Sequence, residues 1–142
     1  MKKSRKQIQS LAVLLYNSFS IFKNHVAIKI NNNTISYAKL NEKAMIIAGF
    51  LSKCGGINKN IGIITQRNYS CYAGVLGSIY AGSAYVPINA KYPKSRILNI
   101  INEADVQIII GNKNDWNMIK SKIKDTNRIR HILLPDSDEV ID

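Results

Sequence analysis

Few residues of this 142-residue chain have the type and spacing that chemistry requires. Gly77 and Gly82, followed by Ser83, have the spacing of a phosphate-binding loop, but such a loop needs lysine where Ser83 stands. We also expect Gly77 to lie inside a helix, whereas a phosphate loop lies between a strand and a helix. We therefore interpret these glycines as packing residues.

The carboxylates are too scattered to act as an acid–base pair. Glu42 falls on the predicted surface of one helix, and Glu103 and Asp105 fall near the end of another. General acid–base work needs a carboxylate held within hydrogen-bond reach of a reacting group. We expect all three side chains to be solvated.

The imidazoles and thiols are equally isolated. Neither His25 nor His131 has a second ligand at metal spacing, so we predict no zinc site. Cys54 and Cys71 are too few and too widely spaced for a disulfide framework or a CxxC redox pair. The sequence thus indicates no self-contained active site.

The charge of the chain is strongly positive, with 20 Lys+Arg against 9 Asp+Glu and a net charge of +11. However, 24 Ile, 16 Asn and 15 Lys make up 55 of the 142 residues, the bias expected from codons rich in A and T. Arg, which nucleic-acid readers favour, is three times rarer than Lys. We interpret the charge as a solvated surface, with a weak anion-binding tail as the alternative, and predict no nucleic-acid partner. The predicted organisation is a basic segment at 1–9, a domain at 10–135 and an acidic tail at 136–142.

A short apolar run near the start does not predict a membrane segment. Only residues 11–15 are continuously apolar, and no small-residue cleavage site follows them. A membrane span needs about 20 apolar residues. We expect a soluble, cytoplasmic protein with no membrane partner.

The spacing of apolar residues predicts the elements that would have to position any site. Helices are predicted over 7–22 and 69–81 and around 97–104 and 116–123. A further helix is predicted to begin after Ser36, whose hydroxyl caps it, and to stop at Gly55-Gly56. Strands are predicted over 26–30 and 34–36, which form a hairpin around 31–33, and over 61–64, 84–87, 106–110 and 132–134. Ala73, Gly77 and Ala81 should let one helix approach a sheet closely. The alternation predicts an α/β fold, a three-layer Rossmann-like parallel sheet with crossover helices.

Two segments at the ends of these elements add a stronger signal. They are Ile35-Ser36-Tyr37-Ala38-Lys39-Leu40, continuing through residue 44, and Tyr80-Ala81-Gly82-Ser83-Ala84-Tyr85-Val86-Pro87-Ile88-Asn89, followed by Tyr92-Pro93 and Arg96-Ile97. In this order they resemble the first two core motifs of the adenylate-forming (AMP-binding) enzymes, and residues 66–68 between them are also similar to that family. The core-motif positions, for which we expect a structural role, are Ser36, Tyr37, Leu40, Ala81, Gly82, Ala84, Tyr85, Pro87, Tyr92, Pro93 and Arg96.

The resemblance spans about 11–135 and implies the N-terminal subdomain of the adenylate-forming enzyme fold. Residues 84–87 and 92–93 are most similar to the amino-acid adenylation domains of nonribosomal peptide synthetases. Asn89 departs from that branch, which usually has Asp at this position. Asn at this position is commoner among acyl-CoA synthetases.

The resemblance also implies a reaction. Family members join a carboxylate to the α-phosphate of MgATP and pass the acyl group to a phosphopantetheine or CoA thiol. The phosphate loop, the substrate pocket and the lysine-bearing C-terminal domain come later in the family's sequence. We therefore expect no catalytic, cofactor-binding or metal-binding residue in this chain. We expect no activity from this truncated or split portion alone. The resemblance implies ATP and Mg²⁺ only for the complete domain.

The resemblance suggests as partners the downstream part of an adenylation domain or a carrier protein. An apolar docking face should also promote self-association. Two other classes of function stay open at this stage. A non-enzymatic α/β binding or interaction module would melt at a higher temperature with its ligand, and a basic nucleic-acid binder would lose affinity steeply as salt rises.

Overall fold

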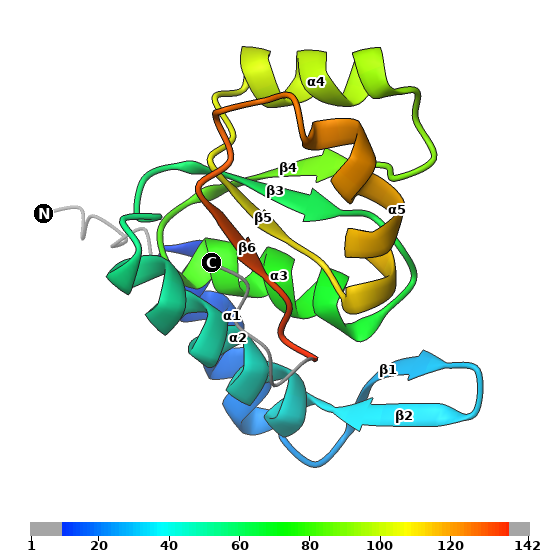
Figure 1. Cartoon of the computed structure of the whole chain (residues 1–142). Helices are drawn as coiled ribbons and strands as arrows, with labels where there is room; N and C mark the ends of the chain where they lie inside the picture. Colours follow the sequence, from blue (N-terminus) through cyan, green and yellow to red (C-terminus); the bar gives the residue numbers. More distant parts are fainter. Residues whose placement is uncertain (1–9, 137–142) are drawn as a thin grey trace, which may run out of the picture.

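The computed structural model describes residues 10–136 (Figure 1). The predicted basic segment 1–9 and residues 137–142 of the predicted acidic tail lie outside the described residues. The helices are α1 (Leu11–Ile21), α2 (Tyr37–Lys53), α3 (Tyr69–Tyr80), α4 (Lys94–Glu103) and α5 (Lys113–Ile123). The strands are β1 (Val26–Ile30), β2 (Asn33–Ser36), β3 (Asn60–Ile64), β4 (Ala84–Ile88), β5 (Ile108–Ile110) and β6 (His131–Leu133). None of the helices within 10–136 is both long and apolar enough to cross a membrane.

Four of the strands form a parallel sheet in the order β4-β3-β5-β6. The predicted parallel sheet with crossover helices is confirmed. β4 lies at an edge, where a strand tolerates the missing donor of Pro87. β5 begins two residues later than predicted, because the Val106 N–H donates to the Ile101 carbonyl at 3.0 Å and so closes the end of α4. β6 begins one residue earlier than predicted.

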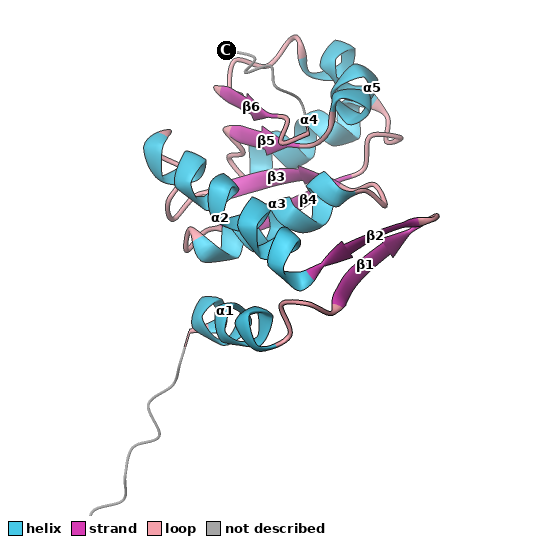
Figure 2. Cartoon of the chain, turned by 90° about the horizontal axis from the view of Figure 1, so that it is seen from below, coloured by secondary structure: helices cyan, strands magenta, loops and turns pink. Residues whose placement is uncertain are grey.

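Helices cover both faces of this sheet, which confirms the predicted three layers (Figures 1 and 2). Along β3 and β5, Ile63 and Ile110 pack toward α2 and α3, whereas Ile64 and Ile109 pack toward α4 and α5. Side chains that alternate between two buried faces explain why these strands are nearly continuous apolar runs. The fold therefore has one apolar core on each face of the sheet.

The antiparallel hairpin of β1 and β2 projects from the helical layer that contains α2 (Figure 2). Its turn includes Asn31 with φ of 54°, a left-handed conformation that asparagine tolerates. The chain then enters α2, where the Ser36 hydroxyl accepts a hydrogen bond from the Lys39 N–H at 3.2 Å. The predicted hairpin and helix cap are both confirmed.

The apolar stripe and the stop of α2 are also as predicted. Leu40, Ala44, Ile47 and Leu51 are buried. The helix ends where Gly55 takes φ of +75° and the following N–H, of Gly56, donates to the Leu51 carbonyl at 2.7 Å. This is the hydrogen bond of a Schellman C-cap, which requires the left-handed residue that glycine supplies without strain.

The small residues of α3 were predicted to let this helix approach the sheet, and for Gly77 this prediction is wrong. A Cβ on Gly77 would lie 2.5 Å from Cγ2 of Ile47 and 3.0 Å from the Ala44 carbonyl, so this glycine lets α3 approach α2 and not the sheet. Gly74 meets the sheet instead: a Cβ there would lie 3.1 Å from side-chain atoms of Ile63 and Ile110. Helical periodicity identifies a face, but the element that covers that face depends on the tertiary fold.

Candidate functional site

The carboxyl edge of the sheet contains a topological switch point. The loop after β3 leads to α3 on one face, and the loop after the adjacent strand β5 leads to α5 on the opposite face. Ligands of open α/β sheets bind in the crevice between two such loops. This edge is therefore the first candidate for a site.

A buried Asn–Asp pair fills this switch point. Asp115 is 3% exposed, and its Oδ2 accepts hydrogen bonds from Nδ2 of Asn68 at 2.9 Å and from the Asn112 N–H at 3.0 Å. Asn68 in turn caps α3, because its Oδ1 accepts from the Cys71 N–H at 2.9 Å. Asn112 caps α5 by accepting from the Asp115 N–H at 2.8 Å. Two helix N-termini on opposite faces are thus joined by one side-chain contact.

The same contacts leave little at this edge to hold a nucleotide. Helix N-termini bind phosphate through free backbone N–H groups, and at this edge the caps occupy an N–H of each helix. The Asp115 carboxylate already accepts from two donors, and within 10–136 no group of three or more His, Cys, Asp or Glu side chains could hold a metal. At this edge, the two capped helix N-termini and the engaged Asp115 carboxylate do not by themselves fit an ATP or magnesium site.

The first core motif lies at the start of α2. Beside the Ser36 cap, the Tyr37 ring meets the Phe19 ring edge-on, with 4.9 Å between centroids. Leu40 is 4% exposed and belongs to the core beneath α2. These residues connect α1 and α2 to the sheet.

The second core motif leads from the end of α3 along β4. Ala81 is the C-cap of α3, and Gly82 has φ of +69°, which favours glycine. The Ala84 N–H then donates to the Lys59 carbonyl at 3.1 Å and starts the pairing of β4 with β3. Tyr85 is exposed on β4, and Pro87 is its penultimate residue.

The segment after this motif forms the connection from β4 to α4. The guanidinium of Arg96 lies over the Tyr92 ring, 4.5 Å from its centroid, and Pro93 is the N-cap residue of α4. Nζ of Lys122 donates to the carbonyls of Ala90 at 2.6 Å and Tyr92 at 2.9 Å and so fastens this loop to α5. All of these contacts hold the loop in place.

The eleven core-motif positions do not converge on one site. They lie at the start of α2, at both ends of β4 and around the first turn of α4. Two of them, Tyr37 and Leu40, line an apolar groove. The carboxylates expected to be solvated, Glu42, Glu103 and Asp105, are exposed, as predicted.

The apolar groove has a volume of about 560 Å³ and lies between α1, β1, α2 and α3. Tyr72, one of its lining residues, is 42% exposed. The residues that line it are Phe19, Ala27, Ile28, Tyr37, Leu40, Cys71, Tyr72, Val75 and Leu76. A cavity with this lining favours an apolar occupant.

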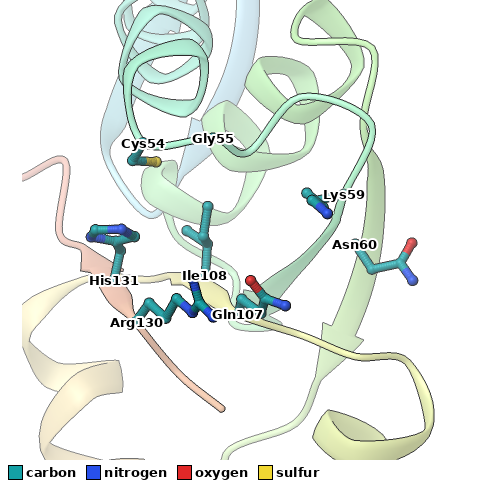
Figure 3. Close-up of a pocket in the computed structure, with 8 residues that line it drawn as sticks. All are labelled: Cys54, Gly55, Lys59, Asn60, Gln107, Ile108, Arg130 and His131. Carbon is teal, nitrogen blue, oxygen red and sulfur yellow. The ribbon is translucent and has the colours of Figure 1, made fainter.

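A smaller, polar cavity, the amino-edge pocket, lies at the opposite end of the sheet (Figure 3). It measures about 210 Å³ and is formed where β3, β5 and β6 begin, beside the end of α2. Its lining residues are Cys54, Gly55, Lys59, Asn60, Gln107, Ile108, Arg130 and His131. The sequence did not predict this pocket, because its walls come from three segments far apart in the chain, 54–60, 107–108 and 130–131.

The two thiols have no sign of nucleophilic activation. Burial raises the pKa of Cys54 at the amino-edge pocket and the pKa of Cys71 at the apolar groove. A raised pKa keeps a thiol protonated at neutral pH, and the thiolate is the nucleophile.

Asp115, the most buried carboxylate among the described residues, was not predicted from the sequence. The spacing Asn112-x-x-Asp115 could have revealed it, since an N-cap residue and an acidic residue at the third helical position form a reciprocal capping box. Its contact with Asn68 joins residues 47 positions apart and has no local signal.

Comparison with known proteins decides the family. The model of the AMP-binding enzyme family matches residues 17–142. The chain belongs to this family. Bacitracin synthase 1 of Bacillus licheniformis is 38% identical over 86 residues, which are 60% of this chain and 2% of that protein. The chain thus spans only a small part of this relative's length.

Solved structures agree on the fold. A red-emitting luciferase from Phrixothrix hirtus superposes with a TM-score of 0.83 at 20% identity and covers 99% of this chain and 35% of its own. The nonribosomal peptide synthetase FmoA3, in its α-methyl-L-serine-AMP bound form, superposes with a TM-score of 0.80 at 21% identity, over 92% of this chain and 14% of its own. The α/β sheet described above is the fold of part of an adenylate-forming enzyme, as the motifs predicted.

Proposed function

We propose that this chain is the opening part of an adenylation domain of the nonribosomal peptide synthetase type. The complete domain would activate an amino acid with ATP and Mg²⁺ as an aminoacyl-adenylate. The observation that carries the proposal is the match of residues 17–142 to the AMP-binding family, together with synthetase relatives such as bacitracin synthase 1. The two core motifs support it, since they stand in the family's order.

We further propose that the reaction needs residues beyond these 142. The Asn68–Asp115 contact occupies the switch point at the carboxyl edge, and the helix caps there engage an N–H of α3 and of α5. Phosphoryl and adenylyl chemistry depends on donors and metal ions positioned around the developing charge. A downstream segment of the family, in the same or a separate chain, would supply them.

The apolar groove is the proposed docking surface for that downstream segment. The luciferase and synthetase chains that share this fold extend far beyond the part that this chain covers. Large exposed apolar patches mark interaction surfaces or ligand grooves, and the occupant that we propose for this groove is the downstream segment. Without that cover, the groove should bind a hydrophobic dye and promote self-association.

Reconstitution of pyrophosphate exchange tests the function. This chain is mixed with a second chain that carries the family's phosphate loop and its remaining motifs, and amino-acid-dependent exchange of pyrophosphate into ATP is measured. We expect exchange from the mixture and none from either chain alone. A mixture in which sedimentation shows the two chains bound, but which gives no exchange with any amino acid, would contradict the proposal.

Two matched substitutions test the docking surface. Tyr72→Glu places a charge in the apolar groove, and Met118→Glu places the same charge on α5, where Met118 is 41% exposed, close to the 42% of Tyr72. We expect Tyr72→Glu to lower dye binding by about half and to weaken binding of the second chain, since a buried unpaired charge opposes docking. Equal effects of the two substitutions would contradict docking at the groove.

A further inference from the structure

The amino-edge pocket collects positive charge from separate parts of the fold. Lys59 immediately precedes β3, Arg130 precedes β6, and His131 is the first residue of β6. Figure 3 shows Lys59 on one side of the hollow and Arg130 and His131 on the other. The fold therefore places two permanent cations and one imidazole around a single cavity.

These cations have no partner that would neutralise them within the described residues. Within 10–136, neither the Lys59 ammonium nor the Arg130 guanidinium makes a hydrogen bond or an ion pair with another residue. Other basic residues differ: Arg128 pairs with Asp105 at 2.8 Å, and Lys39 pairs with Glu42 at 3.0 Å. Like charges around one cavity repel each other, and an anion between them would relieve this repulsion.

The lining of the pocket contains no carboxylate among the described residues. The nearby Asp105 is already engaged, because one of its oxygens accepts from Arg128 and the other accepts from Nε2 of Gln107 at 3.3 Å. The nitrogen of the other lining amide, Asn60, donates to the Ala104 carbonyl at 2.8 Å. The neighbouring carboxylate and amide groups are therefore engaged in other hydrogen bonds, and the two cations are available to a ligand.

The walls of the pocket are fixed by the backbone. The N–H groups of Arg130 and His131 both lie within hydrogen-bond distance of the Gln107 carbonyl, at 2.8 and 3.3 Å. The His131 ring also meets the Phe50 ring edge-on, with 6.4 Å between centroids. Gly55, at the rim, has open space where a Cβ would be. The pocket exists before any ligand binds.

We infer that the amino-edge pocket is a binding site for a small anion that carries a phosphate group. A guanidinium fork and an ammonium are the groups that bind phosphate oxygens. A volume of about 210 Å³ is enough for a compact phosphate or phosphomonoester. The pocket lies at the opposite end of the sheet from the switch point, so this inference is independent of the proposed adenylation function.

Titration of the full chain with inorganic phosphate at constant ionic strength tests the inference. Amide chemical shifts are followed by NMR, and we expect saturable changes at 54–60, 107–108 and 130–131. Arg130→Gln and Lys59→Gln each remove one charge-assisted contact and should weaken binding about tenfold. Both side chains are exposed, so the melting temperature of each variant should stay close to that of the wild-type chain.

The control is Lys29→Gln, which removes the same charge from an exposed position on the β1–β2 hairpin. We expect this variant to bind phosphate as the wild-type chain does. If Lys29→Gln weakens binding as much as the pocket variants, or if neither pocket variant weakens it, phosphate is attracted only by the net charge of +11 and the inference is wrong.

Discussion

The two faces of the sheet differ in how completely they are covered. On the α4 and α5 face, Ile97, Ile101 and Ile109 are fully buried. The opposite layer, with α1, the hairpin, α2 and α3, carries most of the large apolar side chains that are exposed. They include Leu11, Val13, Leu14, Tyr16, Ile21, Phe22, Val26, Met45, Ile46 and Tyr72.

Polar contacts are present on both faces, as where the Tyr80 hydroxyl donates to Oδ1 of Asn41 at 2.7 Å between α3 and α2. On the covered face, Lys122 fastens α5 to the loop after β4, and Arg128 pairs with Asp105 near the end of α4. On the other face, α1 packs mainly on α2, and the apolar groove remains open beside it. The α4 and α5 face thus has the surface of a fully covered layer, whereas the layer with α1, α2 and α3 has the apolar composition of an interface.

The largest expected effect contrasts two large-to-small substitutions, one on each face. Ile101→Ala should lower the free energy of unfolding by about 3–4 kcal/mol, because it leaves a cavity in a fully covered core. Leu76→Ala, at the groove, should cost about 1 kcal/mol, since that side chain is only partly buried. Urea unfolding measures both. Equal losses would show that the two faces are equally well packed.

A second test concerns the packing within the more exposed layer. Gly77→Ala should cost about 2–3 kcal/mol, because the new Cβ would meet Ile47 and the Ala44 carbonyl. Gly49→Ala, also within a helix but with open space around it, should stabilise the chain by up to about 1 kcal/mol. Thermal unfolding distinguishes the two. A neutral Gly77→Ala would mean that α2 and α3 separate freely.

A third test removes the link between the faces. Asp115→Ala deprives Asn68 and the Asn112 N–H of their acceptor and should cost about 2 kcal/mol. Glu42→Ala breaks only an exposed ion pair with Lys39 and should cost about 0.5 kcal/mol or less. Chemical denaturation measures the two losses. If they are similar, the buried pair contributes no more than a surface one.

The smallest effect is a pH dependence at the start of α3. Burial, with the negative charges of Asp136 and Glu42, raises the pKa of Tyr69 from 10.0 to about 12. Its hydroxyl donates to the Lys39 carbonyl at 2.8 Å. The protonated form is favoured by folding, so this contribution to stability is complete below pH 10 and is lost as the pH rises through about 12.

Titration of phenolate absorbance checks this prediction. Tyr69→Phe should remove a transition near pH 12, and Tyr85→Phe, on the exposed part of β4, should leave that transition in place. A Tyr69→Phe variant whose titration keeps the same last transition would contradict the assignment.

Sequence patterns predicted the elements well because their causes are local. The stripe of α2, its cap at Ser36 and its stop at Gly55 each depend on residues within one or two helical turns. Because strands and helices alternate along the chain, only a few sheet topologies are compatible with the sequence, and the observed parallel sheet is one of them.

The site-like features escaped prediction because they depend on distant residues. Gly77 meets Ile47 across two helices, and Asn68 meets Asp115 across two loops. The amino-edge pocket needs the starts of β3, β5 and β6 side by side, an order that no single segment encodes. The core motifs identified a family, but their contacts proved to be spread along the fold.

The Asn68–Asp115 contact also has a mechanical meaning. It joins the first turns of α3 and α5, which belong to opposite layers, around the end of the sheet. A force that slides one helical layer along the sheet must also extend this hydrogen bond, which is anchored on the two residues at the helix starts. The two layers should therefore move as one rigid body, and a partner that docks on one face would carry the other face with it.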